Sequence, residues 1–150
     1  MRPRIDHVEL TVQNLERAEE FYDALLPLLG FEPSRKDRAD RPEHEFRCVD
    51  YGSAAFNLAL VAPRRAFAGE GVCRRRPGAL HHLAFGADSP AEVDRLYGAV
   101  KALPGARIRI APRRYPEYCP DYYAFYFYDT EGIELEIVWF DRPACFSKED

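Results

Sequence analysis

The sequence predicts an α+β fold made of two tandem β-α-β-β-β modules. Three observations support this prediction: an internal repeat, one amphipathic helix in each half, and strand-like alternation on both sides of each helix. The 150 residues match the size of one ordinary domain. We expect a single domain over 1–150, with module one at about 5–61, a linker at about 62–78 and module two at about 79–140.

A shift of 75 residues lays the start of the second half on the start of the first. Segment 6–12 then matches segment 81–87, and His7 meets His82. Towards the end of each module, a shift of 79 residues is used instead, and it aligns Asn57 with Glu136. Because a repeated pattern of this length indicates a repeated fold, each half is expected to form one module.

Each half contains one helix with a recognisable start. Asn14 is a candidate N-cap for the first helix, and Ser89 with Glu92 forms a capping box before the second. After each cap, apolar residues recur at every third or fourth position, which gives each helix one apolar stripe. We expect each stripe to pack against a sheet.

Apolar residues in the predicted strands alternate with residues that could form a site. Successive side chains of a strand point to opposite faces, so the residues between the apolar positions point away from the helices. Those residues are His7, Glu9, His82, Asn57 and Glu136. If the two sheets curl into one half-barrel, His7, His82 and Glu136 can converge.

Two imidazoles and one carboxylate form a plausible set of ligands for a divalent metal. Such a set suits Zn, Ni, Mn, Co or Fe and leaves coordination positions open for substrate oxygens. A single histidine at the start of a strand is more often a hydrogen-bonded structural residue. Because repeat-equivalent positions supply both histidines, one divalent metal ion at His7, His82 and Glu136 is as well supported as the structural interpretation, and both stay open on this argument.

Composition argues against several other classes of protein. The formal net charge of −4 gives no general attraction to nucleic acid, and the arginines at 64–65 and 74–76 are interpreted as a solvated loop. The longest nearly apolar run, 54–62, is far shorter than the roughly 20 residues that a membrane span needs. The first residues lack an apolar leader and the four cysteines are scattered, so we expect a cytoplasmic protein with reduced thiols.

The chain resembles the vicinal oxygen chelate superfamily, which includes glyoxalase I, methylmalonyl-CoA epimerase, extradiol dioxygenases, fosfomycin-resistance thiol transferases and bleomycin-binding proteins. The resemblance runs from residue 5 to residue 139 and rests on the motifs at 5–8, 18–22, 82–85 and 129–136. It implies a glyoxalase-like cupped half-barrel sheet with the helices outside. It also implies His7, His82 and Glu136 as metal ligands and a homodimer as the assembly.

The resemblance implies lyase or isomerase chemistry on a small oxygen-bearing substrate, through a metal-bound enediolate. Glu136 or Glu9 would move the proton, and Tyr126 would donate a hydrogen bond to the substrate. Glyoxalase I usually has a carboxylate at the fourth family position, which this alignment assigns to Asn57. An amide is no base, so Asn57 is expected to bind substrate by a hydrogen bond. For Glu9 alone, a water-exposed carboxylate at a strand edge is the more common interpretation than a catalytic role.

Further substrate-binding residues are expected from the aromatic run near the end of the chain. By strand parity Tyr122, Tyr126 and Tyr128 share a face and could line a cavity for a small polar or aromatic ligand. Ordinary strand propensity explains the same tyrosines equally simply. Arg47, which the 79-residue shift aligns with Tyr126, could hold an anionic group of the substrate or could be a solvated strand residue.

Three other functions within the superfamily stay open. The first is a metal-free small-molecule binding protein like the bleomycin-resistance members. The second is an extradiol-type dioxygenase, although Thr130 replaces the proline of that family and residues 117–119, several positions before Tyr126, include no histidine. The third is a fosfomycin-type thiol transferase, although Glu9 on the face of His7 would repel a phosphonate.

Overall fold

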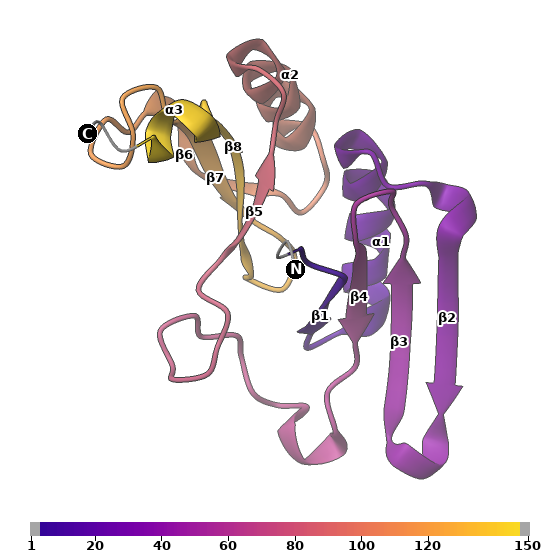
Figure 1. Ribbon diagram of the computed structural model, residues 1–150. Coiled ribbons are helices and arrows are strands. Elements are labelled where there is room, and N and C mark those ends of the chain that lie inside the picture. Colours follow the sequence, from indigo (N-terminus) through magenta and orange to yellow (C-terminus); the bar gives the residue numbers. More distant parts are fainter. Residues whose placement is uncertain (1–3, 148–150) are drawn as a thin grey trace. The chain divides into compact units, whose positions relative to one another are not determined.

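The computed structural model describes residues 4–147, and contacts divide the chain between Cys73 and Arg74 into two compact units. Each unit holds one four-stranded sheet and one long helix in the order β-α-β-β-β (Figure 1). The predicted α+β class and the two predicted modules are therefore confirmed. The division falls inside the predicted linker. The half-barrel that would join the two sheets stays a prediction.

The first unit contains one helix and four strands: β1 (His7–Thr11), α1 (Leu15–Leu25), β2 (Lys36–Arg41), β3 (Phe46–Tyr51) and β4 (Asn57–Val61). The strand order in its sheet is β1-β4-β3-β2. β1 runs parallel to β4, and the other neighbours are antiparallel. Short 3-10 helices occupy Leu26–Leu29, Pro33–Arg35, Pro42–His44 and Arg65–Phe67.

The second unit repeats this plan and adds a short helix: β5 (Leu83–Gly86), α2 (Pro90–Lys101), β6 (Arg107–Arg114), β7 (Tyr123–Tyr128), β8 (Glu134–Trp139) and α3 (Arg142–Phe146). The strand order is β5-β8-β7-β6, again with one parallel pair, β5 with β8. In the part of the chain that the structure describes, no helix is long and apolar enough to cross a membrane.

Both long helices begin where the caps predict. The Asn14 side-chain oxygen accepts a hydrogen bond from the Arg17 amide at 2.8 Å, and the Ser89 hydroxyl oxygen accepts one from the Glu92 amide at 3.1 Å. The Glu92 carboxylate accepts a further bond from the Asp88 amide at 2.8 Å. The bonds from Arg17 and Glu92 satisfy backbone donors that a helix leaves unpaired in its first turn, and the bond from Asp88 ties the preceding residue to the helix start.

The apolar stripes of the helices pack against one face of each sheet. α1 buries Phe21, Tyr22 and Leu25, while Leu58 and Leu60 are buried in β4 of the same unit. α2 buries Val93, Leu96 and Val100 over the sheet that contains the buried β8 residues Leu135 and Ile137. The opposite face of each sheet is thereby left for the polar residues between these positions.

The register of the parallel strands corrects the alignment of the closing strands. His7 lies opposite Asn57 in the first unit, whereas Leu83 lies opposite Leu135 in the second, which puts His82 level with Glu134. Asn57 is therefore the structural counterpart of Glu134. The counterpart of Glu136 is Ala59, which lies opposite Glu9.

In β4 the 79-residue alignment is wrong by two residues, which is one period of the strand. It matched the apolar residues on both sides of Asn57 with those on both sides of Glu136. Because apolar residues alternate with period two, a slip by two positions keeps every residue of β4 on the correct face. Periodicity therefore assigned the face correctly and could not assign the register.

Candidate functional site

The second unit brings four of the predicted site residues together around one buried carboxylate. Glu136 lies in the middle of β8 and is 1% exposed. Its Oε2 lies 3.1 Å from His82 Nε2, and its Oε1 accepts a hydrogen bond from the Tyr122 hydroxyl at 2.6 Å. Tyr126 is the cross-strand partner of Glu136 and also reaches its carboxylate.

The two tyrosines act as hydrogen-bond donors to this carboxylate. Burial raises the pKa of Tyr122, and the hydrogen bond to Glu136 raises it further. Burial also raises the pKa of Tyr126, with the Glu136 charge as the next cause. Both phenols therefore keep their protons well above neutral pH and can donate to an oxyanion.

A chain of hydrogen bonds fixes the protons on the neighbouring histidines. Arg74 Nη1 lies 3.2 Å from His81 Nε2, and His81 Nδ1 lies 2.7 Å from His82 Nδ1. Arginine can only donate, so His81 Nε2 accepts and the His81 proton sits on Nδ1. His82 Nδ1 must then accept as well, and the His82 proton sits on Nε2, directed at Glu136.

A second buried carboxylate lies one pleat away on β8. Glu134 is almost completely buried and has an arginine on each oxygen, Arg109 Nη1 and Arg74 Nη1, both at 2.5 Å. The interpretation of Arg74 as part of a solvated loop is therefore wrong, because this side chain pairs with a buried charge. Strand parity places Glu134 on the face of Glu136. No pattern in the sequence predicts that Arg74 and Arg109 pair with it.

Tyr128 lies at the end of the same face, apart from the carboxylate of Glu136. It is the cross-strand partner of Glu134, and the Arg107 guanidinium lies over its ring at 4.6 Å. This contact is a cation–π arrangement. Tyr128 therefore lies beside Glu134 and Arg107 rather than with Tyr122 and Tyr126.

The first unit presents His7 and Glu9 on the exposed face of its sheet. His7 Nδ1 lies 3.0 Å from Asp6 Oδ2, and this hydrogen bond raises the pKa of His7 above its ordinary value. A carboxylate accepts only, so Nδ1 carries the proton in the neutral ring and Nε2 keeps its lone pair. A carboxylate that orients a histidine in this way is a common companion of metal-ligating imidazoles.

Asp50 is a residue on this face that the sequence analysis missed. It lies opposite Ala59 in β3, as Tyr126 lies opposite Glu136 in the second unit, and Ala59 in turn lies opposite Glu9. The charges of Glu9 and Asp50 also contribute to the raised pKa of His7. Alternation along β3 is the sequence signal that could have placed Asp50 on this face.

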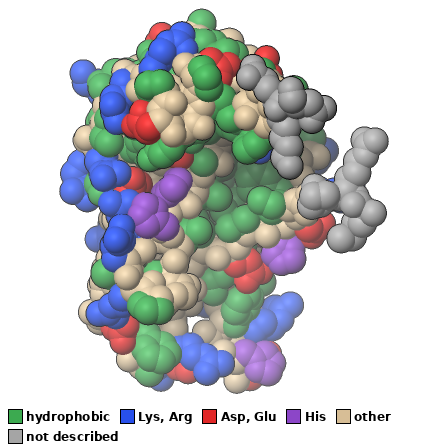
Figure 2. All heavy atoms as spheres, turned by 60° about the vertical axis from the view of Figure 1, so that its left-hand side comes forward, with side chains coloured by type: hydrophobic (Ala, Val, Ile, Leu, Met, Phe, Trp, Pro, Cys, Tyr) green, Lys and Arg blue, Asp and Glu red, His purple; other side chains and the backbone are tan. Residues whose placement is uncertain are grey.

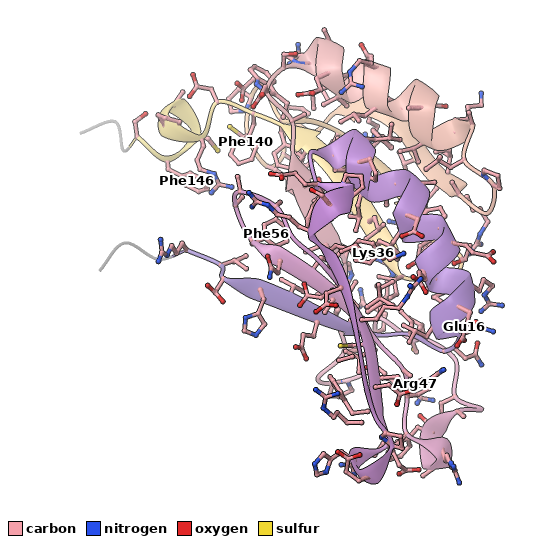
Figure 3. All side chains as sticks on the ribbon, turned by 90° about the vertical axis from the view of Figure 1, so that its right-hand side faces the viewer. Glu16, Lys36, Arg47, Phe56, Phe140 and Phe146 are labelled. Carbon is pink, nitrogen blue, oxygen red and sulfur yellow. The ribbon has the colours of Figure 1, made fainter. Side chains whose placement is uncertain are left out.

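The structure does not bring Arg47 to this face. Arg47 shares the parity of the buried residues Val49 and Tyr51, and its Nη1 donates to Glu16 Oε1 of α1 at 2.9 Å. Figure 3 shows the two side chains near each other at the start of α1. In β3 the 79-residue shift is wrong by three positions, because the counterpart of Tyr126 is Asp50, and an odd slip assigns Arg47 to the opposite face. Asn57, in contrast, lies beside His7 on the predicted face.

The distance between His82 and Glu136 fits two ligands of one ion. Two ligands bound at right angles and at about 2.1 Å would lie about 3.0 Å apart, close to the observed 3.1 Å. Binding through Nε2 requires loss of the proton that now points at Glu136. Within residues 4–147 no three His, Cys, Asp or Glu side chains are gathered to hold an ion. His7 belongs to the other unit.

Comparison with known proteins places the chain among glyoxalase-like sequences. Residues 4–137 match the family model described as Glyoxalase/Bleomycin resistance protein/Dioxygenase superfamily. The uncharacterized protein YqjT of Bacillus subtilis (strain 168) is 28% identical over 139 residues, which cover 93% of this chain and 98% of YqjT.

Solved structures show the same fold. The crystal structure of a candidate glyoxalase from Bacillus halodurans is 30% identical, with a TM-score of 0.68 over 90% of this chain and 94% of that one. A glyoxylase/bleomycin resistance protein/dioxygenase domain from Frankia sp. EAN1pec has a TM-score of 0.72 at 22% identity and covers 94% of this chain and all of its own. FosX of Listeria monocytogenes, solved with Mn(II) and sulfate, has a TM-score of 0.61 at 17% identity, over 95% of this chain and 93% of FosX.

Proposed function

The chain belongs to the Glyoxalase/Bleomycin resistance protein/Dioxygenase superfamily, and on that premise we propose that it is a divalent-metal-dependent enzyme with lyase or isomerase chemistry. Its substrate would be a small molecule with neighbouring oxygens. The observation that carries the proposal is the contact between His82 Nε2 and Glu136 Oε2, in a buried setting braced by Tyr122. FosX, a distant structural relative, was solved with Mn(II), which supports the proposal of a metal.

The proposed metal ligands are His7, His82 and Glu136. A divalent ion held by them would polarise the substrate oxygens and stabilise negative charge that develops on them. Asp6 keeps the His7 ring oriented, and Tyr122 holds the Glu136 carboxylate through Oε1. His82 must give up the proton on Nε2, which lies against Glu136.

The remaining residues would bind the substrate and move its proton. The Tyr126 hydroxyl donates a hydrogen bond to a substrate oxygen, since its raised pKa keeps it protonated. Glu9 or Glu136 Oε1 takes a proton from the carbon beside a carbonyl and returns it to a neighbouring atom. Asn57, beside His7, binds a substrate oxygen through its amide, and Tyr128 bounds the site. Arg47 is left out, because it pairs with Glu16 on the helix face.

Elemental analysis of untagged protein, purified without chelator, tests the metal. We expect about one equivalent of a divalent metal per chain. His82→Ala should lose it while the circular dichroism spectrum stays unchanged, and His44→Ala, at an exposed histidine in the turn between β2 and β3, should keep it. Protein that takes up no metal after reloading, or His82→Ala protein with full metal content, would contradict the proposal.

A metal-free small-molecule binding protein is the second candidate. One observation favours it: the Glu136 carboxylate already has hydrogen-bonding partners on both oxygens, so it does not need a cation. This function predicts ligand binding that survives treatment with a chelator.

We also propose that the protein is a cytoplasmic homodimer. Membership of the superfamily supports a dimer. Light scattering after gel filtration would measure the mass, and a monomer mass would contradict this part of the proposal.

A further inference from the structure

A groove lies at the end of the first unit, where the strand of His7 finishes. It runs between the turn that joins β2 to β3 and the 3-10 helix Arg65–Phe67, and its volume is about 560 Å³. Thr11 and Val61, the last paired residues of β1 and β4, line it. Every residue that lines the groove belongs to the first unit, so its shape does not depend on the second. The lower end of Figure 2 shows a hollow with hydrophobic and basic side chains around it.

Aromatic and aliphatic side chains form one part of the groove wall. Phe46 and Phe67 contribute rings, and Val61 and Pro63 also line the groove. Phe67 is 56% exposed, so a large apolar ring faces water here. A ligand that covered this ring would remove apolar surface from water, which favours binding.

Cationic side chains also line the groove. Arg41 and Arg64 line the groove together with His44, and Glu45 is the one acid among its described lining residues. The Glu45 carboxylate lies 3.7 Å from Arg65 Nε, so part of its charge is compensated from outside this groove. The local balance of charge is therefore positive, although the whole chain carries −4.

We propose that this groove binds a small organic anion with a planar apolar body, such as an aromatic carboxylate or an aryl phosphate. Its ring lies against Phe46 and Phe67, and its anionic group accepts hydrogen bonds from Arg41 and Arg64. The planar guanidinium fork matches both carboxylate and phosphate oxygens. This binding goes beyond the proposed function, because it requires neither a metal ion nor His82 or Glu136.

Titration of the full chain, followed by amide chemical shifts in the presence of a chelator, tests the groove. Phenyl phosphate should shift the amides of Thr11, Val61 and Phe67, whereas phenol and inorganic phosphate should each bind at least about tenfold more weakly. Benzoate in place of phenyl phosphate distinguishes a carboxylate ligand from a phosphate ligand. Equal binding of inorganic phosphate or of phenol, or shifts only outside the groove, would overturn the proposal.

Matched variants separate the groove from general attraction between charges. Arg64→Gln should weaken phenyl phosphate binding about tenfold, and Phe67→Ala about fivefold. Arg35→Gln, at the opposite end of β2 in the same unit, should change it less than about twofold. All three positions are exposed, and unchanged thermal unfolding would show that the fold is kept. A loss as large in Arg35→Gln as in Arg64→Gln would overturn the proposal. The chelator keeps this result independent of the proposed metal.

Discussion

The two units hold their equivalent histidines in opposite hydrogen-bonding states. In the first unit Asp6 accepts from His7 Nδ1, so the neutral ring offers the Nε2 lone pair. In the second unit His81 donates to His82 Nδ1, so Nε2 carries a proton directed at Glu136. The two histidines have the same place in the fold, and the residue before each decides which nitrogen is available.

The carboxylates differ between the units in a related way. In the second unit they lie on the strand beside the histidine, at Glu134 and Glu136 of β8. In the first unit those places hold Asn57 and Ala59, and the acids Glu9 and Asp50 lie on the strands on either side of Ala59. A repeated backbone therefore carries two different charge patterns. One unit has a buried and neutralised pattern, and the other has an exposed one.

The largest expected effect is on the stability of the second unit. Arg74→Met removes one of two cations from buried Glu134, so the free energy of unfolding should fall by about 2 kcal/mol. Asn57→Ala, at the counterpart position in the first unit, and Arg75→Met, at an exposed neighbour, should each cost less than about 0.5 kcal/mol. Urea denaturation measures all three. Equal effects of Arg74→Met and Arg75→Met would show that the buried pairing contributes nothing.

The second-largest expected effect is on metal affinity, and it should have opposite signs in the two units. Asp6→Ala should weaken metal binding about tenfold, because it removes the acceptor that orients His7. His81→Ala should strengthen it about twofold, because it frees His82 from the hydrogen bond that keeps a proton on Nε2. Competition with a chromophoric chelator measures both affinities, and ¹⁵N spectra of the rings report the tautomers. If both variants weaken binding alike, His81 orients His82 rather than opposing the metal.

The smallest expected effect is on the pH dependence of stability, and it should be the same in both units. The pKa of Glu16 in α1 is lowered first by a hydrogen bond from its own backbone N–H and then by Arg47. The pKa of Glu92 in α2 is lowered first by a hydrogen bond from the Asp88 amide and then by Arg95. A lowered pKa in the folded state means that each carboxylate stabilises the protein above its ordinary pKa. That contribution is lost as the pH falls through the lowered value. Glu16→Gln and Glu92→Gln should each reduce the acid-induced loss of stability by less than about 0.5 kcal/mol, measured by urea denaturation at pH 7 and pH 3. An effect of only one of the two substitutions would contradict the prediction that the two helix starts are equivalent.

The elements predicted most accurately from the sequence are those that depend on neighbouring residues. Asn14 and Ser89 mark the helix starts because an N-cap acts within one turn of its own helix. Alternation along the strands likewise placed Glu136 on the face away from the helix. Both signals are local, so tertiary contacts did not need to be known.

The parts of the site that the sequence did not predict depend on contacts between distant segments. Arg74 pairs with Glu134, sixty residues further along, and nothing in the composition of the loop distinguishes Arg74 from its exposed neighbour Arg75. The choice between Asn57 and Ala59 as the counterpart of Glu136 depends on strand register, which a period of two leaves ambiguous.

The parallel pairing of the first and last strands of each unit has a consequence for folding. β1 can pair only after β4 has been made, roughly 50 residues later, and β5 waits similarly for β8. Closing so long a loop costs more chain entropy than forming a helix or an antiparallel hairpin, so the strand that carries each histidine is expected to dock last. A nascent chain that stalls before Val61 would hold a helix and a hairpin, with β1 still unpaired and open to pairing with another chain.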